Sequence, residues 1–299
     1  PYSRLLSLFV TASLVTTRHE HVFDRCRPAN LLGLLQHWLL RGRLRSMALR
    51  RASALLPAAA APIALCSTRP TPSEREALRD RAEREAKLQQ YVQTEALQQY
   101  ARHCKGAERS QRCAETRRAI EDAAHALAHP GTTAGAMRHY HARHGCTRCT
   151  PEAVAACAAF PRIVEIGAGR GHWARALGDA GVAVEAYDDG SALPGRGAAV
   201  YPVNRGDGLA AVRGSPDAAL LLVFPPPTPM AVTALEAFAG RVVLYAGEPR
   251  GGANGTDAFF DALDARYYVA ATVALDPFPG GVEKLFVLKR RRRWWRFFW

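Results

Sequence analysis

The chain has 299 residues, of which 48% are hydrophobic and 22% are charged, which is ordinary for a globular protein and excludes a disordered or fibrous one. The formal net charge of +13 belongs to the two ends: residues 1–73 carry +8, residues 289–296 carry +6, and residues 74–288 carry −1. A nucleic-acid-binding patch lies on the face of the folded domain itself, so no nucleic-acid partner is expected.

The number of cysteines and the hydropathy of the sequence further restrict the class of protein. The chain contains seven cysteines, an odd number, spread over a length that can bury its own core. This pattern is not that of a secreted disulfide scaffold and favours thiols in a reducing compartment. No run reaches the ~18 apolar residues that a membrane-spanning helix needs.

Residues 1–72 are interpreted as a disordered or targeting segment. From Met47 to Pro72 the sequence contains arginine, serine and many alanines, with no Asp or Glu. Such acid-free, arginine-containing segments are typical of organelle transit peptides. We expect a cytoplasmic protein, or a mitochondrial or plastid one if Met47 is the start of a transit peptide.

Residues 73–160 predict a helical segment that packs on the following domain. Ser73 and Glu76 have the spacing of a capping box, and a long helix is expected from there to about His103. Two further helices are expected over 107–129 and 134–144. A fourth is expected to begin after Thr150, with Pro151 at its first position.

After Pro161 the pattern becomes an alternation of short strands and helices. Strands are expected at 162–166, 182–187, 218–224, 241–245, 267–275 and 284–288, and helices at 172–180, 230–239 and 257–265. This alternation predicts an α/β fold with a doubly wound, Rossmann-like sheet over residues 161–289. Ligands of such sheets bind at the carboxyl ends of the strands. Residues 290–299 are interpreted as a basic and aromatic tail.

The most informative motif joins the first of these strands to its helix, and reads Glu165-Ile-Gly-Ala-Gly-Arg-Gly-His172. A dinucleotide-binding loop has the spacing G-x-G-x-x-G, whereas the glycines here are spaced G-x-G-x-G, which disfavours a nicotinamide oxidoreductase. With an acidic residue two places before the first glycine, the loop resembles motif I of class I S-adenosylmethionine-dependent methyltransferases. The resemblance implies a methyltransferase sheet whose loop holds the methionine half of the cofactor, with these residues in contact: Glu165, Gly167, Ala168, Gly169 and Gly171.

Two further acids fit this resemblance. Asp188 follows the next strand directly, 17 residues after Gly171, and a carboxylate there can accept two hydrogen bonds from a ribose diol. Asp207 falls where the family places an acid or amide near the adenine, although a plain turn explains it equally well.

The expected acceptor end of the pocket departs from a related motif. Phe224-Pro-Pro-Pro227 is similar to the D/N-P-P-Y/F motif of amino-group methyltransferases, but Phe224 replaces the Asp or Asn that would accept amine hydrogens. This departure puts methylation of a base or an amide in doubt. The prolines are expected to shape a rigid substrate wall, and Phe224 is assigned to the cofactor-binding residues. Glu248, Tyr245 and His172 are weak catalytic candidates, because no general base is recognisable.

The motifs together resemble a group of uncharacterised methyltransferase-like proteins of eukaryotic microbes over about residues 160–290. The expected function is transfer of a methyl group from S-adenosylmethionine to an unidentified small molecule or protein. The alternative is a methyltransferase-like fold that serves as a non-catalytic binding or assembly protein. No metal is expected, although zinc at the C-x-x-C of Cys146 and Cys149 was weighed as an alternative to simple thiols.

Overall fold

The computed structural model describes residues 68–105, 110–190 and 198–291. The Met47 hypothesis and the tail beyond Arg291 lie outside these residues. The described chain divides into two compact units, one within residues 87–127 and one made of the stretches within 64–86 and 128–299. We describe each unit by itself.

The smaller unit is helical, and its first helix is the continuation of one that begins within the larger unit, before residue 87. The long helix expected from residue 73 is confirmed, but a π-helical stretch, η1 (Val92–Ala96), interrupts it between α3 (Pro72–Tyr91) and α4 (Leu97–His103). The helix α5 (Gln111–Ala128) follows, and its packing with α4 buries a small apolar cluster. The cluster consists of Ala96, Tyr100, Cys104, Cys113 and Ile120.

Two of the seven cysteines are joined to each other. Cys104 and Cys113, both fully buried, form a disulfide between the end of α4 and the start of α5. The sequence offered no signal for this pair, because the nine-residue separation acquires meaning only when two helices bring the ends together.

The start of α3 also differs from the expectation. The reciprocal capping box is Thr71 with Glu74: the Thr71 N–H donates to the Glu74 carboxylate (2.7 Å), and the Glu74 N–H donates to the Thr71 hydroxyl (3.3 Å). Pro72 explains the shift from Ser73, because proline suits the first helical position and fixes the N-cap one residue before itself. The two later helices, α6 (Ala134–His144) and α7 (Pro151–Ala158), begin as expected, α7 with Thr150 as its N-cap.

The larger unit contains a seven-stranded sheet with the order β3-β2-β1-β4-β5-β7-β6. The strands are β1 (Arg162–Ile166), β2 (Ala183–Asp188), β3 (Val203–Arg205), β4 (Ala219–Val223), β5 (Val242–Gly247), β6 (Tyr267–Ala274) and β7 (Lys284–Arg290). The first five are parallel, and β7 runs antiparallel to both β5 and β6. The α/β fold with a doubly wound, Rossmann-like sheet expected from the sequence is confirmed.

Two elements were missed. β3 is three residues long and half to fully exposed, and the six-residue helix α9 (Leu209–Gly214) follows it. Neither has the length that a periodic pattern requires to be recognised.

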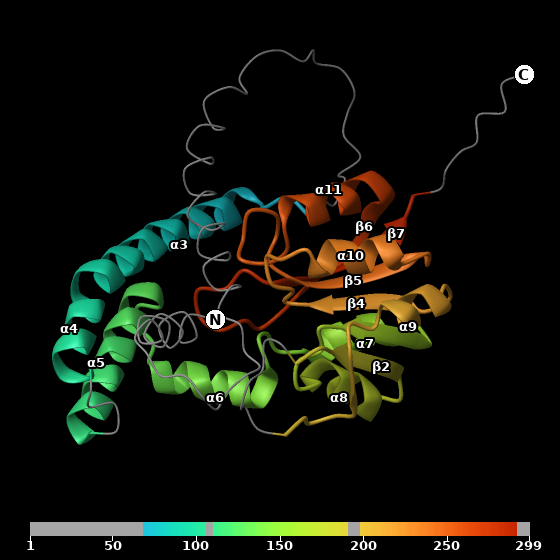
Figure 1. The fold of residues 1–299 in the computed structure, drawn as a ribbon. Coiled ribbons are helices and arrows are strands. Elements are labelled where there is room, and N and C mark those ends of the chain that lie inside the picture. The colour runs from blue at the N-terminus through green and yellow to red at the C-terminus, as the bar shows by residue number, and fades with distance from the viewer. Residues whose placement is uncertain (1–67, 106–109, 191–197, 292–299) are drawn as a thin grey trace, which may run out of the picture. The chain divides into compact units, whose positions relative to one another are not determined.

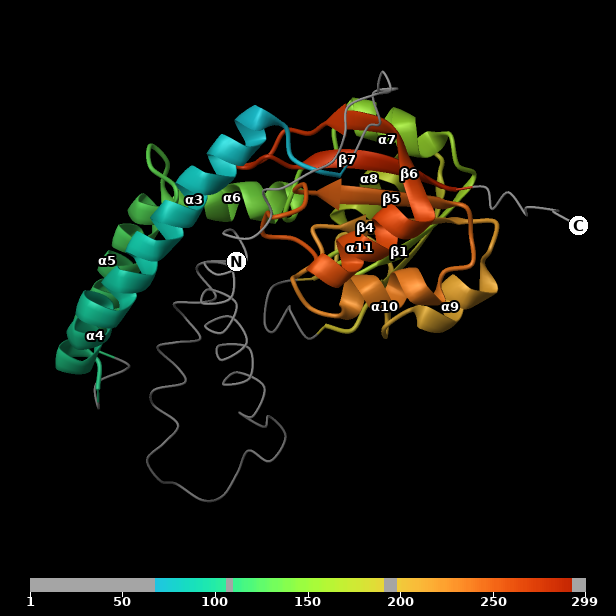
Figure 2. The same ribbon diagram turned by 90° about the horizontal axis from the view of Figure 1, so that it is seen from above.

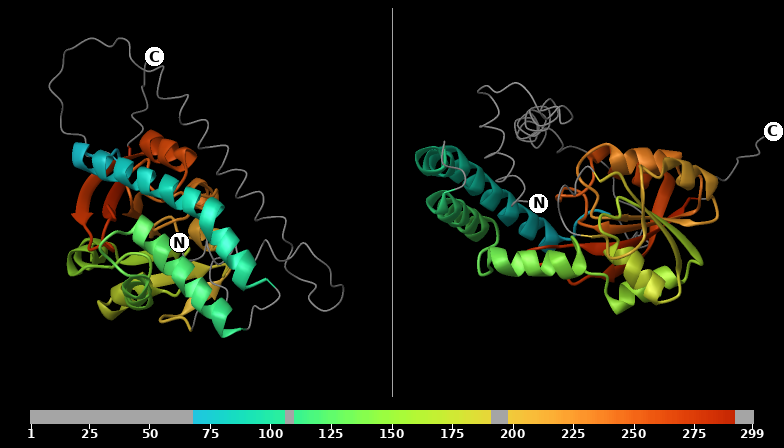
Figure 3. Two further views of the ribbon diagram at one scale, coloured as in Figure 1. Left: turned by 90° about the vertical axis from the view of Figure 1, so that its left-hand side faces the viewer. Right: turned by 60° about the horizontal axis from the view of Figure 1, so that its bottom comes forward.

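Helices cover both faces of the sheet (Figures 1 and 3). α7 and α8 (His172–Asp179) pack on one face, whereas α9, α10 (Met230–Ala237) and α11 (Asp257–Arg266) pack on the other. Figure 2 shows the same two layers from above. Strand β4, buried along nearly its whole length, contributes to both clusters, as expected for the centre of a parallel sheet.

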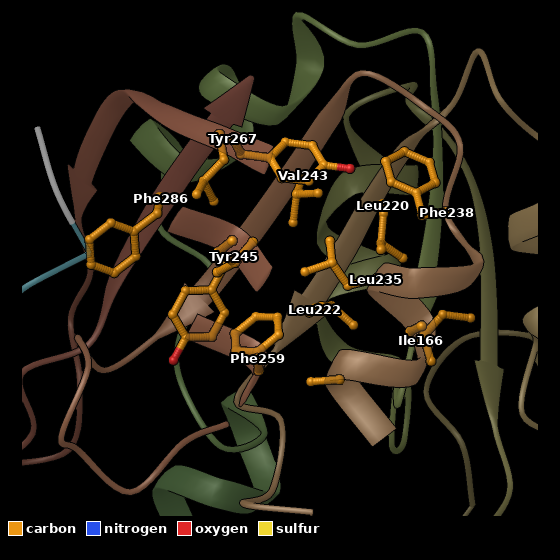
Figure 4. Packing of buried hydrophobic residues seen from close by; sticks show 14 of the residues in the cluster. Ile166, Leu220, Leu222, Leu235, Phe238, Val243, Tyr245, Phe259, Tyr267 and Phe286 are labelled. Carbon is orange, nitrogen blue, oxygen red and sulfur yellow. The ribbon is translucent and has the colours of Figure 1, made fainter. Parts of the chain in front are cut away.

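The aromatic part of the core lies under α11 (Figure 4). Tyr245 stacks on Phe286 and meets Phe259 edge-on, with ring centroids 5.6 and 5.4 Å away respectively. These rings fix the end of β5 against β7 and α11. The residues whose placement the structure describes include no helix long and apolar enough to cross a membrane.

The boundary expected at Lys289 is too early. β7 continues to Arg290, whose guanidinium donates to the Phe238 carbonyl (3.1 Å), and Arg291 donates to the Tyr267 carbonyl (2.9 Å). Two residues assigned to the tail therefore belong to the domain.

Candidate functional site

The site expected from the sequence lies where the strand order reverses. β1 has β2 on one side and β4 on the other, so the chain leaves these neighbouring strands in opposite directions at their carboxyl ends. In open α/β sheets this reversal leaves a crevice in which ligands bind.

The loop after β1 adopts a conformation that requires glycine. Gly167, Gly169 and Gly171 have φ values of +73°, +60° and +81°, a region that other residues rarely occupy. At Gly171 a side chain would also collide with its neighbours, because a Cβ atom there would lie 2.9 Å from the Cβ of Tyr201 and 3.0 Å from Cγ2 of Val203. Between Gly167 and Arg170 the only side chain in the loop is therefore the methyl group of Ala168.

Asp188, the last residue of β2, joins that loop. One carboxylate oxygen accepts the N–H of Gly169 (2.8 Å), and the other accepts the N–H of Gly190 (2.7 Å). A carboxylate has about four acceptor positions, so two remain for a ligand. The structure thus brings two predicted residues, Asp188 and Gly169, into direct contact.

The backbone of the loop is fixed by the same strand. The N–H groups of Gly167 and Ala168 both donate to the Tyr187 carbonyl (2.9 and 3.0 Å), and the Gly171 N–H donates to the Ala168 carbonyl (2.9 Å). Gly167 and Ala168 therefore use their own N–H groups internally.

Glu165 lies inside the molecule rather than on the loop. It is 1% exposed, and its Oε2 has no hydrogen-bond partner among the described residues. Burial raises its pKa to about 8; the negative charge of Asp188 adds to this, and a hydrogen bond from the Ala174 backbone opposes it. Its nearest titratable neighbours on the α7 side include Cys157, whose pKa burial raises to about 12.

The other two cofactor-side candidates have contrasting environments. Asp207 is exposed, and its carboxylate accepts the N–H of Leu209 at the start of α9 (3.1 Å), which is the turn role weighed for it. Phe224 has a φ of +47°, and is the one non-glycine residue with positive φ among the described residues. Such a conformation costs about 1–3 kcal/mol and is concentrated at ligand-binding and active sites. Its N–H donates to the Ala246 carbonyl (2.7 Å), so the end of β4 is tied to β5.

The three catalytic candidates do not form one group. Tyr245 is fully buried, burial raises its pKa well above the usual value, and its hydroxyl donates to the Glu248 carbonyl (2.6 Å), so it supports the strand end rather than exchanging protons. Glu248 is 1% exposed and ion-paired with Arg81 of α3.

His172, in contrast, faces α6. Its Nε2 lies 3.1 Å from the Ala142 carbonyl, and burial lowers its pKa. It lines a pocket of about 400 Å³ between α6 and α8, together with His144 and Arg175. It is therefore not grouped with Glu248.

Three functional candidates were missed by the sequence argument. Arg81 of α3 pairs with Glu248, Asn254 accepts the Glu248 N–H from the loop after β5, and the charge of Glu248 acts on Glu283, which precedes β7. The segment before β7 was interpreted only as a turn rich in proline and glycine. Glu283, an acidic residue directly before an apolar strand, was the one sequence feature that could have indicated a functional residue there.

The C-x-x-C motif shows no metal-binding arrangement. Cys146 and Cys149 retain their thiols, and burial raises the pKa of Cys149. Over the residues with a described position there is no group of three or more His, Cys, Asp or Glu side chains that could hold a metal ion.

No family model and no curated protein matches the chain. Among solved structures, the chain is similar to magnesium protoporphyrin IX methyltransferase from Synechocystis PCC 6803 with bound S-adenosylmethionine, at 16% identity over 47% of this chain and 77% of that one, with a TM-score of 0.35.

Two further solved structures are similar over more of the chain. One is an O-methyltransferase from neocarzinostatin biosynthesis in complex with S-adenosylmethionine and 2-hydroxy-5-methyl naphthoic acid, at 14% identity over 72% of this chain and 70% of that one, with a TM-score of 0.34. The other is a methyltransferase of calicheamicin biosynthesis with S-adenosylhomocysteine bound, at 16% identity over 97% of this chain and 93% of that one, with a TM-score of 0.32. The fold assignment rests on the order of the strands in the sheet.

Proposed function

We propose that the chain is an S-adenosylmethionine-dependent methyltransferase. The observation that carries the proposal is the contact between the Asp188 carboxylate and the N–H of Gly169, at the point where the strand order reverses. It links an acid at the end of β2 to a glycine loop at the end of β1, the two features that the sequence motif implies.

The residues present fit the cofactor. Asp188 keeps two acceptor positions, which suit the two hydroxyls of a ribose. The three positive-φ glycines carry no side chain of their own, which lets their backbone approach a ligand closely. Glu165, Gly167, Ala168 and Gly171 support this loop, and Phe224 at the end of β4 supplies an apolar wall.

The chemistry asks little of the protein beyond placement. S-adenosylmethionine supplies a methyl group on a sulfonium sulfur, which is already activated toward a nucleophile. The chain orients the two reactants, and proximity and orientation alone supply up to about 7–11 kcal/mol of barrier reduction. The stiff backbone between Phe224 and Pro227 serves this purpose by fixing one wall of the crevice.

The test is calorimetric titration of the full chain with S-adenosylmethionine, S-adenosylhomocysteine and NAD. We expect micromolar binding of both sulfur-containing ligands and none of NAD. Binding of NAD alone would replace the proposal with a dinucleotide-dependent activity. Absence of binding by a folded chain would favour the non-catalytic alternative, a methyltransferase-like assembly protein.

A further inference from the structure

A group of three charged side chains lies at the carboxyl end of β5. It consists of Arg81, Glu248 and Glu283. The Arg81 guanidinium of α3 pairs with Glu248 and also donates to the Gly280 carbonyl (2.7 Å). The second oxygen of Glu248 accepts the N–H of Ala253 (2.6 Å). Both oxygens of this buried carboxylate are therefore occupied by protein groups.

Two polar atoms near this ion pair have no hydrogen-bond partner among the residues that the structure describes. Glu283 is 8% exposed, and its Oε2 makes no hydrogen bond to any described residue. Asn254 is 1% exposed; its Oδ1 accepts the Glu248 N–H (2.9 Å), while its Nδ2 is unsatisfied within the same residues. Buried polar groups in native proteins are nearly always satisfied, so an orphaned acceptor and an orphaned donor in one cluster require an explanation.

When Glu283 is ionised, the charges of the cluster do not balance. Arg81 provides one positive charge against the carboxyls of Glu248 and Glu283, and Lys284 is engaged by Glu74. Burial, and then the charge of Glu248, raise the pKa of Glu283 to about 7, while Arg81 opposes the shift. The other titratable groups that face it are the phenols of Tyr140 and Tyr245, which are neutral. An added cation would restore neutrality.

The cluster is adjacent to the expected place of methyl transfer. The loop after β5 that carries Asn254 is tied to the loop after β4, because the Gly255 N–H donates to the Pro225 carbonyl (3.0 Å). Pro225 follows Phe224, which stands where the related amino-group motif has an Asp or Asn. The end of β4 therefore has no acidic side chain at Phe224, but the neighbouring strand β5 is followed by the acid Glu248.

We propose that Arg81, Glu248, Asn254 and Glu283 form the acceptor subsite, and that it takes an amine, whose proton Glu283 receives. This inference rests on the proposed methyltransferase function. The ammonium proton passes to the Glu283 carboxylate, and the freed nitrogen lone pair attacks the methyl carbon. The carbon–sulfur bond breaks as the carbon–nitrogen bond forms, which leaves S-adenosylhomocysteine and a methylated ammonium.

Arg81 has a second role in this arrangement. Its side chain, 15% exposed, contacts both Glu248 and the loop before β7, so it covers the subsite from the side of α3. An acceptor amine enters when this contact opens, and it then supplies the positive charge that the two carboxyls lack.

The test uses three probes of equal chain length and different head group: n-butylamine, n-butanol and n-butyrate. The full chain is loaded with S-adenosylhomocysteine, and the carboxyl carbon of Glu283 is followed by NMR during titration at several pH values. We expect n-butylamine to bind at least 10-fold more tightly than the other two and to lower the pKa of Glu283. Glu283→Gln should lose this preference at least 10-fold, with S-adenosylhomocysteine affinity kept within about 2-fold, and the exposed Glu236→Gln on α10 should behave as wild type.

The outcomes separate the two proposals. If S-adenosylhomocysteine binds but the amine has no preference over the alcohol, or if Glu283→Gln retains the preference, the acceptor subsite is refuted and the methyltransferase proposal stands. If S-adenosylhomocysteine does not bind, both are refuted. If Glu283→Gln fails to fold, the pH-dependent NMR response of the wild type to amine and alcohol decides the matter alone.

Discussion

The carboxylate of Asp188 accepts the backbone N–H of Gly169 at 2.8 Å, so a side chain at the end of β2 holds the loop that follows β1. Its other oxygen holds Gly190 in the same way. One residue therefore holds two backbone segments at the carboxyl ends of neighbouring strands, and its carboxylate keeps further acceptor positions.

Removing that carboxylate should weaken both the fold and the binding site. In Asp188→Ala the N–H groups of Gly169 and Gly190 lose charged acceptors, and we expect the free energy of unfolding to fall by about 2 kcal/mol. S-adenosylhomocysteine affinity should fall at least 10-fold. Urea denaturation and calorimetric titration measure the two effects, and Asp217→Ala, an exposed aspartate before β4, serves as the control. Unchanged affinity in Asp188→Ala would argue against the ribose role.

Two glycines with nearly equal φ allow the cost of backbone strain to be distinguished from the cost of steric crowding. Gly171 and Gly181 have φ values of +81° and +82°, but a Cβ atom at Gly181 meets nothing within 4 Å, whereas one at Gly171 meets Tyr201 and Val203. Gly181→Ala should cost about 1 kcal/mol of stability through strain alone. Gly171→Ala should cost about 1–3 kcal/mol more through overpacking. If the two variants lost equal stability in thermal denaturation, the side chains around Gly171 would have to move aside at no cost, which would contradict the crowding.

The pair of Arg81 and Glu248 allows a mutant cycle. Arg81→Met leaves the Glu248 carboxylate, 1% exposed, without its cation, and we expect a loss of about 3 kcal/mol of stability. Adding Glu248→Gln to that variant should recover at least half of the loss, because the uncompensated charge is removed. Chemical denaturation of the four proteins checks this, and simple addition of the two single effects would show that the residues are not coupled.

Glu165 should make stability depend on pH. Its pKa is raised to about 8 in the folded protein from an ordinary value near 4.5. Between these values the folded form holds a proton that the unfolded form releases, so stability falls as pH rises from 4.5 to 8 and then levels off, by an amount on the order of 4 kcal/mol. Glu165→Gln should flatten this part of the profile and exceed wild type in stability at pH 8.5. A profile unchanged from wild type would mean that the carboxyl is not buried as described.

The course of the chain was largely predictable from its sequence, for reasons visible in particular elements. β1 and β4 are apolar runs, Thr150 with Pro151 marks a helix start, and the loop of Gly167 to Gly171 has a spacing tied to backbone conformation. β3 and α9 were not predictable, because elements of three and six residues are too short to show a hydrophobic periodicity. The Thr71 cap was missed because Ser73 with Glu76 has the same spacing.

The contact of Asp188 with the glycine loop was predictable from the sequence, whereas the cluster of Arg81, Glu248 and Glu283 was not. Asp188 and the glycine loop come from consecutive strand ends, which the sequence displays side by side. Arg81, Glu248 and Glu283 are separated by up to about two hundred positions and meet only because β7 is inserted next to β5 and the start of α3 lies against the loop before β7. A long-range pairing of this kind leaves no local pattern.

A crystal structure of the full chain with S-adenosylhomocysteine would show whether the glycine loop and Asp188 hold the cofactor. We expect the ribose hydroxyls within hydrogen-bonding distance of the Asp188 carboxylate and the amino-acid part of the ligand against the backbone of Gly167 to Gly169. A ligand bound elsewhere, such as in the pocket between α6 and α8, or one that leaves Asp188 without contact, would contradict it.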